Sequence, residues 1–244
     1  MGPLIGKLFS VFKKESFCAL CASGEQIEIQ RALQGGAQVN RADRKGKTPL
    51  MYAAGANEDP QVIRFLIHAG ARIDAKDEEG LSALLYAAGT NPSPGVIREL
   101  LKAGADLEIK DNEGWTLLMY AAGFNANHEV VSVLLETGVD VRARNEEGTT
   151  PLMCVASLNG NVRTIKLLLE SGADVDARDN QGVTALMGAA EFCDNPEILE
   201  ILLQAGADPG AKDTHGRSVL DCAQENDALR GTEVLRKLEV SSPS

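Results

Sequence analysis

Glycine recurs every 34 residues along this chain, in two interleaved columns. The first column is Gly46, Gly80, Gly114, Gly148, Gly182 and Gly216, and the second is Gly36, Gly70, Gly104, Gly138, Gly172 and Gly206. Each glycine of the first column opens a near-copy of the string KTPLMYAAG. A period of this length predicts a stack of similar units, each burying its apolar face against its neighbours.

Each unit contains the signals of two helices. Leu50, Ala53 and Ala54 have helical spacing, and the alanines are small enough to let a neighbouring inner helix approach closely. A column of capping residues then begins an outer helix: Asp59, Ser93, Asn127, Asn161 and Asn195, three of them followed by proline. The second glycine column ends that helix, since glycine adopts the left-handed C′ conformation without steric cost.

The segment between the outer helix and the next unit is predicted to be a finger. In the second unit it reads ARIDAKDEEG, a short extended stretch that runs into a D-x-x-G turn. We therefore expect a hairpin-like projection in every unit.

The pattern D-x-x-G-x-T-x-L-x-x-A-A, followed by V-I-x-x-L-L-x-x-G-A-D, resembles the ankyrin repeat in its bacterial style, with 34-residue units. The resemblance implies an all-α solenoid of stacked helix-turn-helix units with short β-hairpin fingers. In the family a histidine usually follows the helix-opening leucine. Other residues stand there in this chain: Met51, Leu85, Met119, Met153, Met187 and Asp221. We therefore expect apolar packing in place of histidine-mediated hydrogen bonds between repeats.

The repeats divide the chain into caps and full units. Five full repeats are expected at 43–76, 77–110, 111–144, 145–178 and 179–212. Degenerate capping repeats are expected at 17–42 and 213–238, and a disordered tail at 239–244. Residues 1–16 are expected to form an N-terminal capping or amphipathic helix. Its apolar face could cover the first repeat or lie on a membrane surface, and the capping role is the favoured one.

Charge and cysteine usage limit the partners and the compartment. The formal net charge of −11 argues against nucleic acid, because phosphate contacts are made by lysine and arginine. No apolar run approaches the ~20 residues of a membrane-spanning helix. The five cysteines are odd in number and widely spaced, which favours a reducing, cytoplasmic location. Cys18 and Cys21 lack a second ligand pair for zinc, so they are expected to be apolar helix residues.

Residues of catalytic type do not form a recognisable arrangement. His68, His128 and His215 occupy different positions within their units, and no acidic or nucleophilic residue accompanies them at a repeated spacing. The sequence also lacks the glycine-rich strings of nucleotide-binding loops. We therefore expect no enzymatic activity, no cofactor and no metal site.

The resemblance implies that fingers and inner helices line a concave binding face. On that face we expect a stripe of large apolar side chains: Leu81, Trp115, Phe124, Leu158 and Phe192. The alternative is that some of them fold back onto neighbouring repeats. A basic column stands just before the finger turns, at Lys76, Lys110, Arg144, Arg178 and Lys212. It could bind an acidic segment of a partner or only neutralise the nearby carboxylates.

These observations predict a non-enzymatic, monomeric scaffold or adaptor that binds another protein. Two alternatives remain open. The chain could inhibit or stabilise one enzyme by covering it, or it could be an adaptor tethered to a membrane through residues 3–15.

Overall fold

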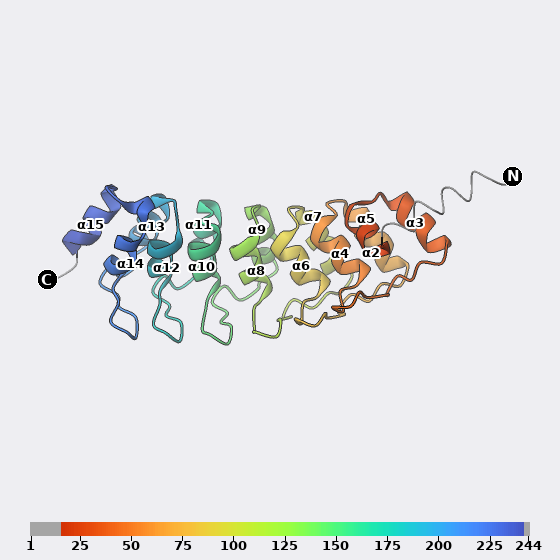
Figure 1. Cartoon of the computed structure of the whole chain (residues 1–244), viewed down its shortest axis with the longest axis horizontal. Helices are drawn as coiled ribbons and strands as arrows, with labels where there is room; N and C mark the ends of the chain where they lie inside the picture. The colour runs from red at the N-terminus through yellow and green to blue at the C-terminus, as the bar shows by residue number, and fades with distance from the viewer. Residues whose placement is uncertain (1–15, 242–244) are drawn as a thin grey trace. The chain divides into compact units, whose positions relative to one another are not determined.

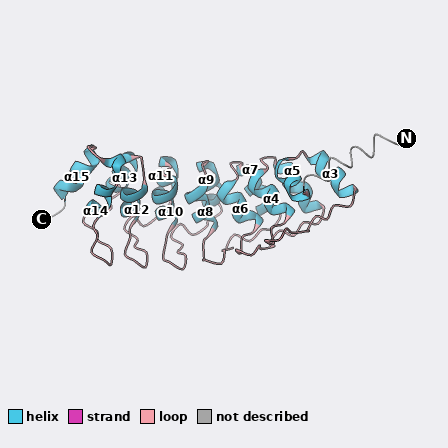
Figure 2. Ribbon diagram, viewed as in Figure 1, coloured by secondary structure: helices cyan, strands magenta, loops and turns pink. Residues whose placement is uncertain are grey.

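The computed structural model describes residues 16–241, and these form helices joined by turns and loops, without a β-strand (Figures 1 and 2). The chain divides into two compact units, residues 1–112 and residues 113–244. The segment expected to be an N-terminal helix, residues 1–16, lies outside the described residues except for Ser16, which is the N-cap of the first described helix. In each unit, shorter inner helices stack on one another and outer helices pack behind them.

The described part of unit 1, residues 16–112, contains three helix pairs. Its inner helices are α2 (Phe17–Ser23), α4 (Pro49–Ala56) and α6 (Ala83–Thr90), and its outer helices are α3 (Gln26–Gln34), α5 (Pro60–His68) and α7 (Pro94–Lys102). Helix α4 packs between α2 and α6, and α5 packs against both α3 and α7. Ala53 and Ala54 are completely buried. This burial agrees with the close helix approach expected from the alanine positions.

Between residues 113 and 241, unit 2 contains four helix pairs. Its inner helices are α8 (Leu117–Phe124), α10 (Pro151–Cys154), α12 (Ala185–Phe192) and α14 (Val219–Glu225). Its outer helices are α9 (His128–Glu136), α11 (Val162–Glu170), α13 (Pro196–Gln204) and α15 (Glu233–Ser241). Helix α10 continues as a π-helical turn, η1 (Val155–Asn159), and a 3₁₀ turn, η2 (Asp227–Leu229), precedes α15.

The predicted helix boundaries are found in the structure. The side chains of Asp59, Asn127, Asn161 and Asn195 cap their outer helices, while Ser93 takes the N-cap position without a side-chain hydrogen bond. Gly104 follows the last residues of α7 with φ of 90°, as the C′ position requires. Helix α15 extends to Ser241, past the expected start of the tail, because Val234 and Leu238 are buried and anchor it.

The fingers have the hairpin form, but turns rather than strands hold them. In the finger of residues 77–81, the Asp77 side chain accepts hydrogen bonds from the N–H groups of Glu79 and Leu81, at 3.1 and 2.8 Å. Gly80 takes a φ of 82°, and a Cβ atom there would lie 2.5 Å from the Asn112 Oδ1 atom. One isolated antiparallel bridge joins Lys212 to Ser218. The β-hairpin fingers of the expected fold are therefore turn-stabilised loops.

Buried asparagines, which the sequence interpretation missed, connect successive repeats. The Asn91 side chain donates to the carbonyls of Ala54 and Asn57, at 2.8 and 2.9 Å. Asn57, Asn159 and Asn226 donate in the same way to two carbonyls of the preceding repeat. We call these four residues the asparagine ladder. At the position after the helix-opening leucine, Met51, Leu85 and Met119 are completely buried, as apolar packing requires. The asparagine amides add polar contacts between repeats that the sequence interpretation did not include.

Candidate binding face

The expected stripe residues of unit 2 include the most exposed apolar side chains of its inner helices. Phe124, Leu158 and Phe192 are 53%, 55% and 62% exposed. All three stand at the equivalent position near the end of an inner helix, just before the turn to the outer helix. Helices α8, α10 with η1, and α12 pack in succession, so these side chains lie on consecutive repeats. A patch of exposed apolar side chains of this kind is typical of an interaction surface.

Trp115 lies at the Phe124 end of this apolar surface. Its ring stacks on Phe124 with a centroid distance of 5.8 Å and an interplanar angle of 25°, and both rings contact Tyr120. Trp115 itself is half-buried. A Cβ atom at Gly123 would lie 3.3 Å from Leu158 and 4.0 Å from Trp115, so both side chains reach over this glycine. We call Trp115, Phe124, Leu158 and Phe192 the apolar stripe of unit 2.

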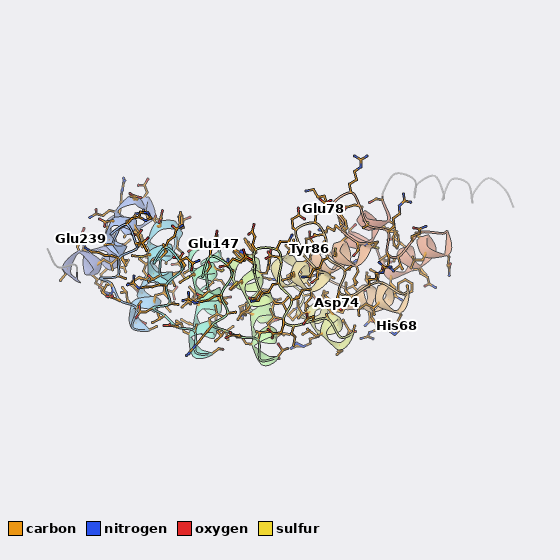
Figure 3. The ribbon with its side chains drawn as sticks, turned by 90° about the horizontal axis from the view of Figure 1, so that it is seen from below. His68, Asp74, Glu78, Tyr86, Glu147 and Glu239 are labelled. Atoms are coloured by element: carbon orange, nitrogen blue, oxygen red, sulfur yellow. The ribbon has the colours of Figure 1, made fainter. Side chains whose placement is uncertain are left out.

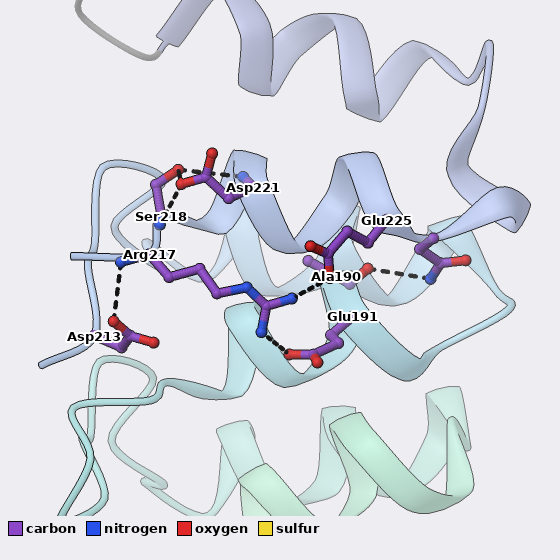
Figure 4. Close-up of polar contacts among 8 residues, drawn as sticks. Ala190, Glu191, Asp213, Arg217, Ser218, Asp221 and Glu225 are labelled. Carbon is purple, nitrogen blue, oxygen red and sulfur yellow. Dashed lines mark hydrogen bonds and ion pairs between the residues drawn. The ribbon is translucent and has the colours of Figure 1, made fainter. Parts of the chain in front are cut away.

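An ion-pair cluster stands at the other end of the apolar stripe. Arg217 donates to Glu191 at 2.9 Å and to Glu225 at 2.6 Å, joining α12 to α14 (Figure 4). Glu191 precedes Phe192 in the chain, and Glu225 ends its inner helix as Phe192 does. The carboxylates hold the pKa of the Arg217 guanidinium above its usual range, chiefly through the hydrogen bond that Arg217 donates to Glu191. Arg217 is therefore held in place by its own unit.

Leu81, the remaining stripe residue, lies in unit 1 in different surroundings. It is half-buried and lines a pocket with Tyr52, Tyr86 and Lys47. The Lys47 ammonium lies 4.5 Å from the centroid of the Tyr52 ring and 3.7 Å from that of Tyr86. These cation–π contacts clamp the lysine between two rings. Burial lowers the pKa of Lys47, although the nearby aspartates oppose that shift.

The two tyrosines of this pocket are also fixed by hydrogen bonds. The Tyr52 hydroxyl donates to Asp43 at 2.8 Å, and the Tyr86 hydroxyl donates to Asp77 at 2.7 Å. The hydrogen bond from Tyr52 lowers the pKa of the Asp43 carboxyl and raises that of the phenol. For Tyr86, burial is the main cause of a raised pKa. We call Lys47, Tyr52 and Tyr86 the lysine clamp. The sequence interpretation missed it, although Tyr52, Tyr86 and Tyr120 recur every 34 residues.

The basic column connects consecutive fingers. Lys76 donates to the carbonyl of Lys110 at 2.8 Å. Arg144 donates to the carbonyl of Arg178, and Arg178 donates to that of Lys212, both at 2.7 Å. Each of these side chains therefore binds the main chain of the next finger, a role that neither sequence-based alternative included. The side chains remain exposed, and their use by a partner stays a prediction.

Fingers and inner helices share one side of unit 1. Figure 3 shows Glu78, at a finger tip, at one edge of the unit and His68 at the opposite edge, with Tyr86, on α6, nearer to Glu78 than to His68. In unit 2 the fingers are joined by backbone hydrogen bonds, with the Asn180 N–H donating to Glu147 at 2.9 Å. The tips carry exposed carboxylates, among them Glu146 and Glu147.

Reactive groups are buried or scattered. All five cysteines are free and buried, and desolvation raises the pKa values of Cys21 and Cys154 to about 12. Within residues 16–241, no group of three or more His, Cys, Asp or Glu side chains could hold a metal ion. Among the same residues, no helix has the length and apolar character needed to cross a bilayer.

Comparisons with known proteins agree with this architecture. The family model described as "Ankyrin repeats (3 copies)" matches residues 9–77, 54–145 and 125–213. The ankyrin repeat domain of human ASB11 is 22% identical, with a TM-score of 0.80, and the match covers 94% of this chain and 99% of that one. The ankyrin repeat domain of Bcl-3, a member of the IkappaB protein family, is 29% identical, with a TM-score of 0.66 and coverage of 91% and 98%. No curated protein matches the sequence. Because the family matches span most of its length, the chain belongs to the ankyrin-repeat family.

Proposed function

We propose that this protein is a non-enzymatic scaffold that binds a partner protein on the face formed by its fingers and inner helices. The observation that supports this proposal is the apolar stripe of unit 2. Phe124, Leu158 and Phe192 are more than half exposed at the same position in three consecutive repeats. Exposed apolar patches mark interaction sites, and a few large side chains provide most of the binding energy in protein interfaces. Ankyrin repeats are generally protein-interaction modules, which agrees with this use of the face.

The surface is well suited to binding without large rearrangement. The apolar stripe rests on inner helices whose core residues are completely buried, such as Leu118 and Leu186 at 1% and 0% exposure. Side chains held on rigid elements lose little conformational entropy when a partner binds. The free, buried thiols favour a cytoplasmic location, where cysteines stay reduced. We further propose that the protein acts as a monomer.

Capture of the partner from the native lysate tests the proposal. The full chain and its Phe124→Ala/Phe192→Ala variant are immobilised in parallel, and the captured proteins are identified by mass spectrometry. A partner should be retained by the unsubstituted chain and lost with the variant. An Ile27→Ala variant is the matched control, since Ile27 is an exposed apolar residue of unit 1. Equal capture by all three proteins would contradict the proposed face.

A further inference from the structure

The formal charge of the chain is distributed unequally between the two units. Residues 1–112 contain fourteen Lys and Arg and fourteen Asp and Glu, so they are formally neutral. Residues 113–244 contain ten basic and 21 acidic residues, so they carry the entire net charge of −11. The apolar stripe therefore belongs to the acidic unit. A ligand of this surface gains from positive charge, because the field of the unit steers cations toward it.

Carboxylates flank the apolar stripe in the chain and at the finger tips. Glu191 and Glu225 share the single guanidinium of Arg217, so this cluster keeps a net negative charge. Asp194 is exposed two residues after Phe192. Glu146 and Glu147 are exposed on the finger that precedes α10. A partner segment with apolar residues on one side and lysine or arginine beside them would complement this pattern.

The backbone of unit 2 favours a helix over an extended segment as the ligand. The finger-tip N–H groups of Glu146, Asn180 and Thr214 already donate to the neighbouring fingers, at 3.3, 2.9 and 2.8 Å. An extended ligand would therefore find no row of free main-chain donors at these tips, as strand addition requires. A helix satisfies its own backbone groups and presents only side chains.

The repeat spacing also fits a helical ligand. Packed helices lie about 8–10 Å apart, so the apolar side chains of successive repeats are separated by a similar distance. Two turns of a helix, seven residues, advance it by about 10.5 Å. Apolar residues at positions i, i+7 and i+14 of a ligand helix could therefore contact Phe124, Leu158 and Phe192 in turn.

From these observations we propose that the apolar stripe of unit 2 binds a cationic amphipathic helix of the partner protein. This inference rests on the proposed scaffold function and specifies the chemistry of the ligand. Phe124, Leu158 and Phe192 take the apolar face of the helix, and Glu146, Glu147 and the Arg217 cluster lie beside its lysine and arginine residues.

Binding of designed peptides tests the inference. The probe is an amphipathic helix of about 20 leucine and lysine residues, with leucines repeating at i, i+3, i+4 and i+7. One matched peptide has glutamate in place of every lysine, and another has the same composition in scrambled order. Trp115 is the only tryptophan of the chain, so its fluorescence reports binding at the stripe. The cationic helix should bind at least about tenfold more tightly than either matched peptide.

Variants locate the binding site. Phe124→Ala/Phe192→Ala should weaken binding of the cationic helix at least about tenfold. Glu146→Gln/Glu147→Gln should weaken it about threefold at low salt, and this loss should diminish as salt screens the charges. The control, Glu170→Gln/Glu200→Gln, removes the same charge from outer helices α11 and α13 and should change affinity less than about twofold.

The possible outcomes separate this inference from the scaffold proposal. Equal binding of the glutamate or scrambled peptide overturns the cationic helix, even if the native partner still depends on Phe124 and Phe192. Equal losses in the finger-tip and outer-helix variants also overturn it. Light scattering tests whether a second copy of the chain is the ligand, because it measures the molar mass in solution. A dimer that becomes a monomer on Phe192→Ala would show that a second copy, and not a partner helix, occupies the stripe. Residues 1–15 of this chain could also occupy the stripe and compete with the peptide. In that case a Lys7→Glu/Lys13→Glu/Lys14→Glu variant should bind the peptide at least about tenfold more tightly, and this result would replace the partner helix with residues 1–15 as the ligand.

Discussion

The two units share one repeat architecture but differ in the side chains on their finger and inner-helix face. After the finger glycines, unit 1 has Lys47 and Leu81, and the lysine is clamped between Tyr52 and Tyr86. At the ends of its three inner helices unit 1 has the small residues Ser23, Ala56 and Thr90, and the Thr90 hydroxyl donates to carbonyls of its own unit.

Three of the four repeats of unit 2 have large apolar side chains at the same position, Phe124, Leu158 and Phe192, and leave them exposed, whereas α14 ends in Glu225. Its tyrosine column also changes after Tyr120, to Cys154, Gly188 and Cys222. Equivalent repeat positions therefore have no fixed function. In unit 1 the side chains of the finger and inner-helix face, such as Lys47 and Thr90, make contacts within the unit. In unit 2 the apolar stripe stays exposed and available to a partner.

The largest expected effect tests whether the asparagine ladder stabilises both units alike. Asn91 is completely buried, donates two hydrogen bonds and accepts one from the Ser93 N–H. Asn91→Ala should lower the free energy of unfolding by about 3 kcal/mol, because buried carbonyls lose their donors. In unit 2 the ladder position between Asn159 and Asn226 is occupied by Cys193. Cys193→Ala should cost only about 1 kcal/mol. Urea denaturation of both variants gives the difference, and equal costs would contradict the assigned role of the amide.

The second prediction concerns the exposed apolar side chains of unit 2. Phe124→Ala/Phe192→Ala should weaken binding of the natural partner by at least about 2 kcal/mol and change the free energy of unfolding by less than about 0.5 kcal/mol. Adding Trp115→Ala should also cost about 1 kcal/mol of stability, since Trp115 is half-buried and stacked on Phe124. Calorimetric titration and thermal melts measure the two effects. An early melt of the double variant would show that the phenylalanines act in the core.

The third prediction is that the C′ glycines matter equally in both units, although the faces differ. Gly104 in unit 1 and Gly138 in unit 2 have φ of 90° and 83°, and a Cβ atom at either would meet nothing within 4 Å. Gly104→Val and Gly138→Val should each cost about 1–2 kcal/mol, because only the backbone conformation is strained. Chemical denaturation checks the pair, and a loss confined to one unit would mean that the two scaffolds differ.

The fourth prediction tests whether the lysine clamp only stabilises unit 1. Lys47→Met keeps the apolar stem and removes the charge, so it should cost about 0.5–1 kcal/mol of stability through lost cation–π contacts. It should leave affinity for the natural partner unchanged. Thermal melts and titrations measure both quantities. A large loss of affinity would assign partner binding to unit 1 as well.

The smallest expected effect is the pH dependence that the ion pairs of Glu99 give to unit 1. Hydrogen bonds from Arg64, at 2.8 and 2.9 Å, and from Lys102, at 3.0 Å, lower the pKa of Glu99 to about 2. A depressed carboxyl pKa stabilises the fold above the unfolded value of 4.5 and loses that contribution as pH falls toward 2. Because Arg64 is 47% exposed, we expect these ion pairs to contribute at most about 1 kcal/mol to the free energy of unfolding.

Urea denaturation of Glu99→Gln and of the unsubstituted chain between pH 5 and pH 3 measures this contribution. The unit 2 counterpart is Val133, so Val133→Ala should leave the pH profile unchanged. An identical profile for Glu99→Gln would contradict the ion-pair assignment.

The sequence predicted what depends on local backbone chemistry. Caps at Asp59 and Asn127, the left-handed glycines and the exposed positions of Phe124, Leu158 and Phe192 followed from residue type and period. Contacts between repeats were harder to predict. From the sequence, the side-chain amide of Asn91 could equally cap a helix or face solvent. The distance between stacked repeats decides the outcome, because it places the carbonyls of Ala54 and Asn57 within reach of the amide. Likewise, the pocket around Lys47 needs two tyrosines from successive repeats.

The acceptors of the asparagine ladder and of the basic column have a consequence for how such a protein can evolve. Asn91 and Lys76 both donate to main-chain carbonyls, which are present whatever side chain a neighbouring repeat carries. A copied repeat inserted in register would therefore find its acceptors already in place. Face residues such as Leu158 can drift without weakening the junctions between repeats. Repeat duplication and sequence divergence can thus change which partner the surface binds, while the hydrogen bonds that join successive repeats stay the same.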